Sequence, residues 1–409
     1  MEDNGVNLEQ LERWKGILTF GRSIPRAWAE QRFKFHNDNY PCISQPRGGP
    51  CGVLAVVQAR LMKALFFERA KVPATQTDPI SICYKKALVV ALADTIWVAA
   101  RITDKKHPKP IFVSKTHLFP SGYKMTRAND LRHLITTIDE AFQDIGQYDV
   151  MSLLYSVLAT KGPGMRMPHE SMINFDTNDA GQPLVNLLIC GRDALCATDG
   201  NVDPYIEGIP ERCDIGFLPE EQSAKNMNLG LFLKDPYFPA WVLNKYEHYS
   251  VLYCMDRALL HVDGTYQVYW MHGGIVGQCD KILANESGSN SSSNGCAGVN
   301  ESPDRRVKRG MGSSGIDGAH SESNLGALRL SGSEVPVAAA CHSEIDSDTS
   351  TQWDESPSTC SDRPFSGMLD LETSKITGTE DVETSAIRSC LETRWDRCRI
   401  LAIESMVPD

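Results

Sequence analysis

Apolar residues in the first half of the chain recur mostly at the spacing of α-helices. Leu54, Val57, Leu61 and Leu65 follow a Gly-Gly-Pro turn at this spacing, which predicts a helix that begins near Cys51. The run 84–101 is apolar on almost every face and therefore predicts a buried helix. Further helices are expected at 129–138, with the Asn129 side chain as its cap, at 151–160 and at 183–195.

The pattern changes to alternation after residue 240. Segments 241–243, 248–253 and 265–270 carry β-branched and aromatic residues at strand spacing. The pair Asp263-Gly264 between the last two is typical of a hairpin turn. Helices followed by a sheet predict an α+β fold with an N-terminal helical part and a C-terminal β-rich part.

A polar segment then interrupts the globular pattern. Residues 285–384 are rich in Ser, Gly, Asp, Glu and Thr and contain few large apolar side chains. Such a segment cannot bury enough surface to offset the entropy lost on ordering, so we predict a long disordered insertion. Apolar residues return at 387–391 and 399–403. We therefore expect 1–284 to form the main domain and 385–409 to pack back onto it.

Charge follows the same division of the chain. The protein has 409 residues with 41 basic and 52 acidic side chains, a net charge of −11. The insertion alone holds 17 acidic and 7 basic residues, a net charge of −10, so the remainder is nearly neutral. A nearly neutral globular part excludes the broad basic surface of a nucleic-acid-binding protein. The basic cluster 305–309 is interpreted as a solvated linker in preference to a nuclear import signal.

Several features indicate a protein of the cytoplasm or the nucleus. The longest apolar run, 87–100, is too short for a membrane span and contains Asp94. The N-terminus, Met-Glu-Asp-Asn, lacks the basic start of a secretory signal. The 13 cysteines show no paired spacing, so we expect reduced thiols and no zinc site. No phosphate-binding glycine motif is present, and we expect neither a metal nor an organic cofactor.

The segment Gln-Pro-Arg-Gly-Gly-Pro-Cys-Gly-Val-Leu-Ala at 45–55 is the strongest candidate for chemistry. It delivers Cys51 to the first turn of a buried helix, where unpaired N–H groups and the helix dipole favour a thiolate. The glycines leave room for a substrate backbone beside the sulfur. The pattern alone fits a nucleophile and an inert buried cysteine about equally well.

A nucleophilic thiol needs a base, and His248 is the best placed of the ten histidines. It begins an apolar strand, and a strand-end histidine facing a helix-N-terminal cysteine is the arrangement of thiol proteases. His261 and His272 are the competing candidates. A structural histidine at position 248 also remains open at this stage.

The motif at 45–55 resembles the catalytic motif of the MINDY family of deubiquitinases, in the branch with Gly-Gly-Pro-Cys-Gly-Val-Leu-Ala. Further segments are similar to family blocks in the expected order, over about 15–275. They are Tyr-Ser-Val-Leu at 155–158, Leu-Val-Asn-Leu-Leu-Ile-Cys-Gly-Arg at 184–192, Asp-Gly at 199–200, Asp-Ile-Gly-Phe-Leu at 214–218, Leu-Lys-Asp-Pro-Tyr-Phe-Pro-Ala-Trp-Val at 233–242 and Glu-His-Tyr-Ser-Val-Leu-Tyr at 247–253.

The resemblance implies a papain-like cysteine protease variant that cleaves isopeptide bonds in polyubiquitin. It implies Cys51 as nucleophile, His248 as general base and Gln45 as a donor to the oxyanion, together with the Cys51 backbone N–H. It also implies ubiquitin and polyubiquitin as partners, and a preference for the proteasome-targeting lysine linkage.

Two departures from the family pattern leave alternatives open. The usual Tyr-Asp-Gly-Leu after the histidine strand is replaced by Tyr-Trp-Met-His-Gly-Gly at 269–274, which removes an acidic residue. The closing Thr-Arg-Trp at 393–395 is followed by Asp-Arg in place of Pro-Gly. The chain could therefore be an inactive ubiquitin-binding module, or a thiol isopeptidase for another ubiquitin-like modifier.

Overall fold

The computed structural model of the chain describes most of the predicted main domain and part of the C-terminal segment. The described residues are 4–37, 40–45, 48–75, 77–145, 148–162, 171–203, 206–245, 248–262, 265–272, 275–283, 387, 389–395 and 400–405. The predicted insertion at 285–384 and the Asp263-Gly264 pair lie outside these residues.

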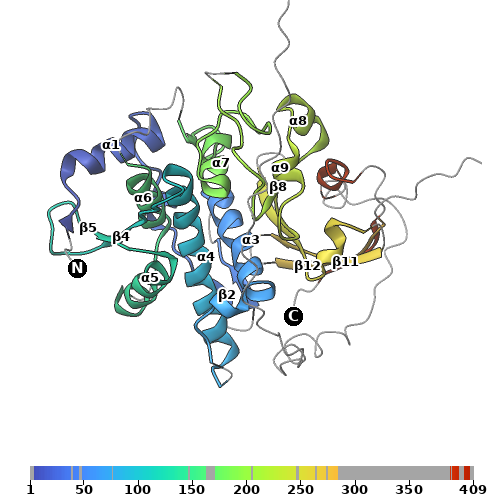
Figure 1. Ribbon diagram of the computed structural model, residues 1–409, viewed down its shortest axis with the longest axis horizontal. Helices are drawn as coiled ribbons and strands as arrows, with labels where there is room; N and C mark the ends of the chain where they lie inside the picture. Colours follow the sequence, from blue (N-terminus) through green and yellow to red (C-terminus); the bar gives the residue numbers. More distant parts are fainter. Residues whose placement is uncertain are drawn as a thin grey trace, which may run out of the picture. The chain divides into compact units, whose positions relative to one another are not determined.

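Helices dominate the first two thirds of the described chain, as the sequence predicts (Figure 1). They are α1 (Leu8–Thr19), α2 (Arg26–Glu30), α3 (Cys51–Phe66), α4 (Ile80–Thr103), α5 (Leu131–Ile145), α6 (Val150–Lys161), α7 (Gln182–Cys190), α8 (Glu221–Asn226) and α9 (Leu231–Lys234), with 3-10 turns η1 (Arg69–Lys71) and η2 (Arg257–Leu260).

The strands form one large sheet and three small ones. The large sheet has the order β13-β12-β11-β10-β9-β8, and β1-β5-β4, β2-β3 and β6-β7 form the others. In chain order the strands are β1 (Asn4–Gly5), β2 (Phe35–Asn37), β3 (Tyr40–Ile43), β4 (Ile111–Lys115), β5 (Tyr123–Arg127), β6 (Ile173–Asn174), β7 (Asp179–Ala180), β8 (Gly216–Pro219), β9 (Ala240–Lys245), β10 (His248–Cys254), β11 (Thr265–His272), β12 (Ile275–Leu283) and β13 (Ile400–Ser405). The α+β prediction is confirmed.

Helix α4 is buried because other helices surround it. It packs against α3, α5, α6 and α7, which explains why its sequence is apolar on nearly every face. In Figure 1, α3 and α4 lie between α1, α5 and α6 on one side and the large sheet on the other. No helix among the described residues is long and apolar enough to cross a membrane.

The central strands β9 and β10 of the large sheet are apolar on both faces. Val242 and Val251 belong to the main core with the helices, whereas Trp241 and Leu252 belong to a second cluster. This alternation follows the two-residue period of a strand. The second cluster is completed by the C-terminal segment, where the Trp395 ring packs on Trp241 with centroids 5.3 Å apart. Strand β13 also pairs antiparallel with β12.

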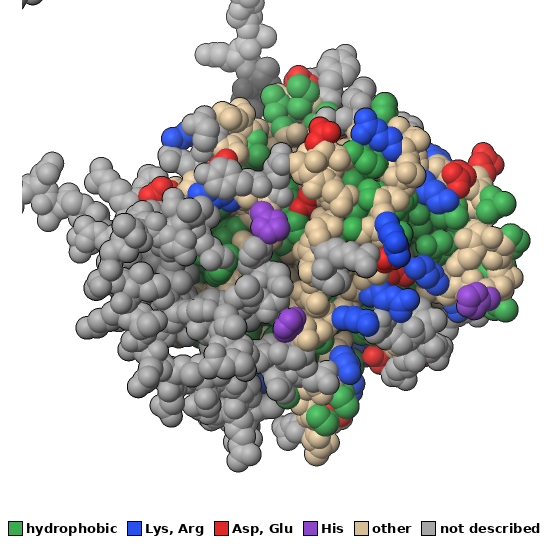
Figure 2. Space-filling model, turned by 180° about the vertical axis from the view of Figure 1, so that it is seen from behind, with side chains coloured by type: hydrophobic (Ala, Val, Ile, Leu, Met, Phe, Trp, Pro, Cys, Tyr) green, Lys and Arg blue, Asp and Glu red, His purple; other side chains and the backbone are tan. Residues whose placement is uncertain are grey.

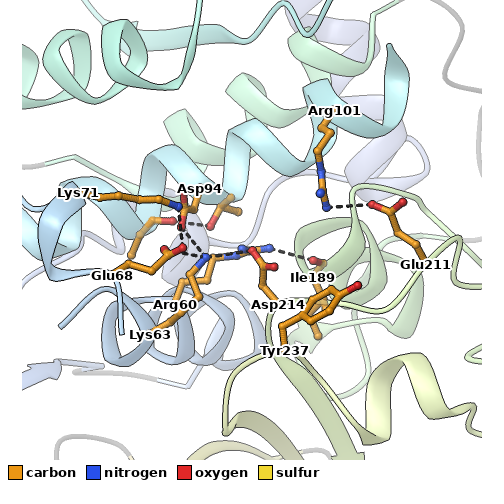
Figure 3. A network of polar contacts seen from close by, with 12 residues as sticks. Arg60, Lys63, Glu68, Lys71, Asp94, Arg101, Ile189, Glu211, Asp214 and Tyr237 are labelled. Atoms are coloured by element: carbon orange, nitrogen blue, oxygen red, sulfur yellow. Dashed lines mark hydrogen bonds and ion pairs between the residues drawn. The ribbon is translucent and has the colours of Figure 1, made fainter. Parts of the chain in front are cut away.

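A buried network of charges fixes the C-terminal half of α3, the helix that begins at Cys51 (Figure 3). Lys63 is 1% exposed, and its Nζ lies 2.8 Å from Asp94 Oδ2 on α4 and 3.0 Å from Asp214 Oδ2 and Glu68 Oε2. Arg60 donates to the carbonyls of Leu188 and Ile189 at the end of α7, which satisfies two helix-terminal acceptors. The network therefore joins α3, α4, α7 and the segment before β8.

Three local predictions need correction. The Asp130 side chain, not that of Asn129, caps α5, because it accepts from the backbone N–H of His133. Helix α7 ends at Cys190 and not at 195, because Gly191 adopts a left-handed conformation with φ +75°. Strands β10 and β11 do pair antiparallel, but their connection includes η2 and is not a two-residue turn.

Candidate active site

Helix α3 begins at Cys51, as predicted. Pro50 stands at the cap position and offers no side-chain hydrogen bond to the first turn. The Cys51 backbone N–H donates to Gly49 O at 2.7 Å, so this predicted oxyanion donor is occupied within its own turn. The side chain of Cys51 is only 4% exposed.

Asp179 is the partner of the thiol, and it was not identified from the sequence. The Cys51 thiol donates to Asp179 Oδ2. The other carboxylate oxygen, Oδ1, accepts from the backbone N–H groups of Gly52 at 3.1 Å and Ala180 at 2.6 Å. A residue from β7 therefore supplies the cap that Pro50 cannot supply. The only signal in the sequence, an Asp three residues before a helix, fits an ordinary cap of α7 equally well.

Strand β7 holds the two predicted catalytic segments together. The Tyr249 hydroxyl on β10 donates to the Ala180 carbonyl at 2.9 Å. On the other side, a Cβ at Gly52 would lie 2.8 Å from the Ala180 Cβ, so only glycine allows this approach. The starts of α3 and β10 thus meet through Asp179 and Ala180.

His248 lies at the start of β10, as predicted, and its ring is exposed. Its Nδ1 atom lies 3.9 Å from Cys51 Sγ, which is a long contact for proton transfer. The competing His261 lies exposed at the end of η2. The side chain of His272 is outside the described residues. Geometry therefore favours His248 as the base for Cys51.

Gln45, the oxyanion donor that the resemblance implies, lines the same pocket as Cys51. A small pocket of about 30 Å³ is lined by Gln45, Cys51, Tyr249 and Met271, among other residues. Gln45 follows β3, which is fixed because the buried Gln58 side chain accepts from Ile43 N at 2.8 Å and donates to Pro41 O at 2.7 Å. Met271, which belongs to the departure from the family pattern at 269–274, also lines this pocket.

The electrostatics of the site favour a neutral thiol, contrary to the expectation from the helix dipole. Burial raises the pKa of Cys51 well above its usual value, and the charge and hydrogen bond of Asp179 raise it further. Burial also raises the pKa of Asp179, although its hydrogen bonds with Cys51, Gly52 and Ala180 and the nearby His248 oppose this. The geometry therefore corresponds to a resting state in which the sulfur is protonated and bonded to a carboxylate.

Metal ligands and further cysteines are the other candidates for chemistry among the described residues. No group of three or more His, Cys, Asp or Glu side chains among them could hold a metal ion. The eight cysteines in the described part of the chain are free, and all but Cys196 are buried. Cys51 is the one whose sulfur contacts both a carboxylate and an imidazole within this part.

A helix-N-terminal cysteine opposite a strand-start histidine in an α+β fold is the arrangement found in thiol hydrolases. The family model described as the deubiquitinating enzyme MINDY-3/4 conserved domain matches residues 19–284, and the chain belongs to this family. The chain is 29% identical over 302 residues to the human protein named "Probable ubiquitin carboxyl-terminal hydrolase MINDY-4", covering 65% of this chain and 39% of that protein.

A second group of relatives carries the MINDY-3 name. The chain is 25% identical over 282 residues to "Ubiquitin carboxyl-terminal hydrolase MINDY-3" of Danio rerio, covering 58% of this chain and 62% of that protein. The chain thus spans about two fifths of the length of its MINDY-4 relatives. No solved structure matches it.

Proposed function

We propose that the chain is a cysteine-dependent deubiquitinase that hydrolyses isopeptide bonds in polyubiquitin. The observation that carries this proposal is the approach of Cys51 Sγ to His248 Nδ1, 3.9 Å apart, in a domain of the MINDY-3/4 family. Both relatives described above are named ubiquitin carboxyl-terminal hydrolases. We further propose the proteasome-targeting lysine linkage as the preferred substrate, and the cytoplasm or the nucleus as the location.

Catalysis would begin when the thiol leaves Asp179 and transfers its proton to His248. The sulfur then attacks the carbonyl carbon of ubiquitin's C-terminal glycine. The tetrahedral oxyanion would be held by the Gln45 amide and by the Cys51 N–H, once this N–H has left Gly49 O. Each donor would contribute about 3 kcal/mol. His248 next protonates the leaving lysine amine, and water hydrolyses the thioester.

Two contacts must therefore break before the first chemical step. The thiol is bonded to Asp179, and the Cys51 N–H is bonded to Gly49 O. A Cβ at Gly48, which precedes this turn, would meet no atom within 4 Å, and glycine has a wider choice of backbone conformations than other residues. We propose that ubiquitin binding supplies the free energy for this rearrangement.

An exposed apolar surface close to α7 supports a protein substrate. Leu195, Val202, Ile206 and Leu231 are 50%, 58%, 40% and 66% exposed. Backbone hydrogen bonds from Gly230 N to Ala197 O and from Val202 N to Ile206 O hold them together. The Asn186 side chain on α7 donates to Ala194 O at 2.8 Å, and α7 begins two residues after Ala180. Clustered exposed apolar side chains are typical of protein contact surfaces, and we assign ubiquitin to this one.

The decisive test uses ubiquitin with a thiol-reactive electrophile at its C-terminus. We expect an adduct of one ubiquitin on the wild type and none on Cys51→Ala, as measured by intact mass. His248→Ala should form the adduct more slowly, and Gln45→Ala should slow chain cleavage while still forming the adduct. A panel of diubiquitins, each with one linkage, then tests the linkage preference. Cleavage that persists in Cys51→Ala would refute the proposal.

The occupied thiol and the buried Met271 favour one alternative, an inactive ubiquitin-binding module. In that case ubiquitin would bind equally well to the wild type and to Cys51→Ala, and neither protein would form an adduct or cleave chains. A thiol isopeptidase for another modifier would instead give an adduct with the probe of that modifier and none with ubiquitin.

A further inference from the structure

A second cavity, of about 550 Å³, lies among elements that contribute nothing to the candidate active site. Its walls come from α1, the C-terminal ends of α4 and α6, the segment between α4 and β4, and β5. Its volume is within the range of pockets that bind small organic molecules. Neither Cys51, Asp179 nor His248 lines it, so an occupant here would be separate from the proposed substrate.

Among the described residues, four cationic side chains from four different segments line this cavity. They are Arg13 on α1, Lys109 before β4, Arg127 at the end of β5 and Lys161 at the end of α6. Within the described part of the chain, no hydrogen bond or ion pair joins the Arg127 guanidinium to another group. Lys161 Nζ donates to Gly191 O at 3.1 Å, and burial lowers the pKa of this lysine. An anion beside Lys161 would compensate for this loss of solvent.

Negative groups at the cavity are fewer and partly engaged. Asp104 is the one carboxylate among the described residues of its wall, and its Oδ1 accepts from the backbone N–H groups of Lys106 and His107. The carbonyl ends of α4 and α6 each add about half a negative charge. Counted over the described lining residues alone, four cations, the Asp104 carboxylate and two helix ends sum to about two positive charges. The cavity therefore attracts anions even after its own helix ends are taken into account.

The floor of the cavity is apolar. Trp14, Ile17 and Leu158 line it and are 7%, 2% and 2% exposed. One face of Trp14 stacks on Tyr155, with ring centroids 5.6 Å apart, which fixes the indole in place. An occupant would therefore combine negative groups with an apolar or planar part. In Figure 2, Lys and Arg side chains gather on the half of the face that lies behind the left-hand elements of Figure 1.

We propose that this cavity binds a small organic polyanion of about nucleotide size, which places its charged groups on Arg127, Lys109, Arg13 and Lys161 and its apolar part against Trp14. Arg127 offers a planar pair of donors that suits a phosphate or a carboxylate group. The proposal goes beyond the proposed deubiquitinase and does not depend on it.

Isothermal titration calorimetry of the full chain with ATP, inorganic triphosphate and adenosine tests the proposal. We expect ATP to bind more tightly than triphosphate, adenosine to bind most weakly, and both polyanions to lose affinity at high salt. The double variant Arg127→Ala/Lys109→Ala should lose about tenfold or more in ATP affinity. Both side chains are exposed, so the fold should survive.

Lys106→Ala is the matched control, because this exposed lysine is on the same segment as Lys109 and does not line the cavity. It should bind ATP like the wild type. Absence of binding of either polyanion at millimolar concentration would overturn the proposal. So would equal ATP affinity in the wild type and the double variant, or equal losses in the double variant and Lys106→Ala.

Discussion

Replacement of Asp179 by Asn tests whether this carboxylate holds the thiol in a resting state. Asn has nearly the same shape, and its Oδ1 atom can still accept from Gly52 N and Ala180 N, which lie 3.1 and 2.6 Å from the Asp179 oxygen. The cap of α3 is therefore retained. The variant removes the negative charge that faces Cys51 and the acceptor that binds its proton.

The expected size of the effect follows from electrostatics. Two unit charges about 4 Å apart repel by about 4 kcal/mol at an effective dielectric constant of about 20, which corresponds to about three pKa units. Burial is the largest cause of the raised pKa of Cys51, and burial is the same in the variant. We therefore treat about three units as the upper limit for the fall in the pKa of Cys51. We expect the pKa of Cys51 to fall by at least about one unit and its thiolate fraction near neutral pH to rise about tenfold.

The assay is the rate of Cys51 alkylation by iodoacetamide against pH, followed by peptide mass spectrometry, because only the thiolate reacts. The rate profile of Asp179→Asn should move to lower pH, with a rate about tenfold higher near neutrality. Asp176→Asn, an exposed position in the same β6–β7 connection, is the matched control, and the half-exposed Cys196 is an internal reference. An unchanged or slower rate at Cys51 in Asp179→Asn would refute this account of the site.

Three further substitutions test the scaffold and the proposed substrate surface. Lys63→Met removes the lysine that pairs with Asp94 and Asp214 and leaves Glu68 paired with Lys71 alone, so it should lower the free energy of unfolding by about 3–5 kcal/mol in urea. Lys71→Met, at a 40% exposed partner of the same network, should cost less than about 1 kcal/mol. Equal costs would contradict the buried network. Trp395→Ala should cost about 3–5 kcal/mol in the same experiment, and no cost would show that the C-terminal segment does not stabilise the sheet. Leu231→Glu should raise the KM for ubiquitin chains while iodoacetamide still alkylates Cys51 at the wild-type rate. Leu118→Glu, at an 82% exposed position outside the surface, should leave the KM unchanged, and equal KM values for the two variants would contradict the assignment.

The sequence was sufficient to predict the features that depend on local periodicity. The starts of α3 and β10, the buried character of α4 and the α+β order all follow from the spacing of apolar residues. Predictions of element ends were less accurate, because they depend on single residues. Neighbouring Asn129 and Asp130 are equally good caps by composition, and only the bond to His133 N distinguishes them. From the sequence, Gly191 could equally continue or end the helix. Only the structure shows that Val98 packs against it.

The protonation state of the thiol could not be predicted because it depends on contacts between segments far apart in sequence. A cysteine at a helix N-terminus normally gains thiolate character from the dipole. Here the Asp179 carboxylate, 128 residues away in sequence, lies at the N-terminus of α3. The helix dipole would otherwise act on a substrate or a thiolate at this position. The approach of Asp179 requires Gly52, since any Cβ there would meet Ala180, and the Tyr249 hydroxyl fixes Ala180 in place.

The glycine after the cysteine therefore has a structural role that differs from the substrate access suggested by the motif. It allows β7 to reach the start of α3, where a single carboxylate caps the helix and keeps the thiol protonated. If the chain is the deubiquitinase that we propose, displacement of this carboxylate is the step that links substrate binding to activation of the nucleophile.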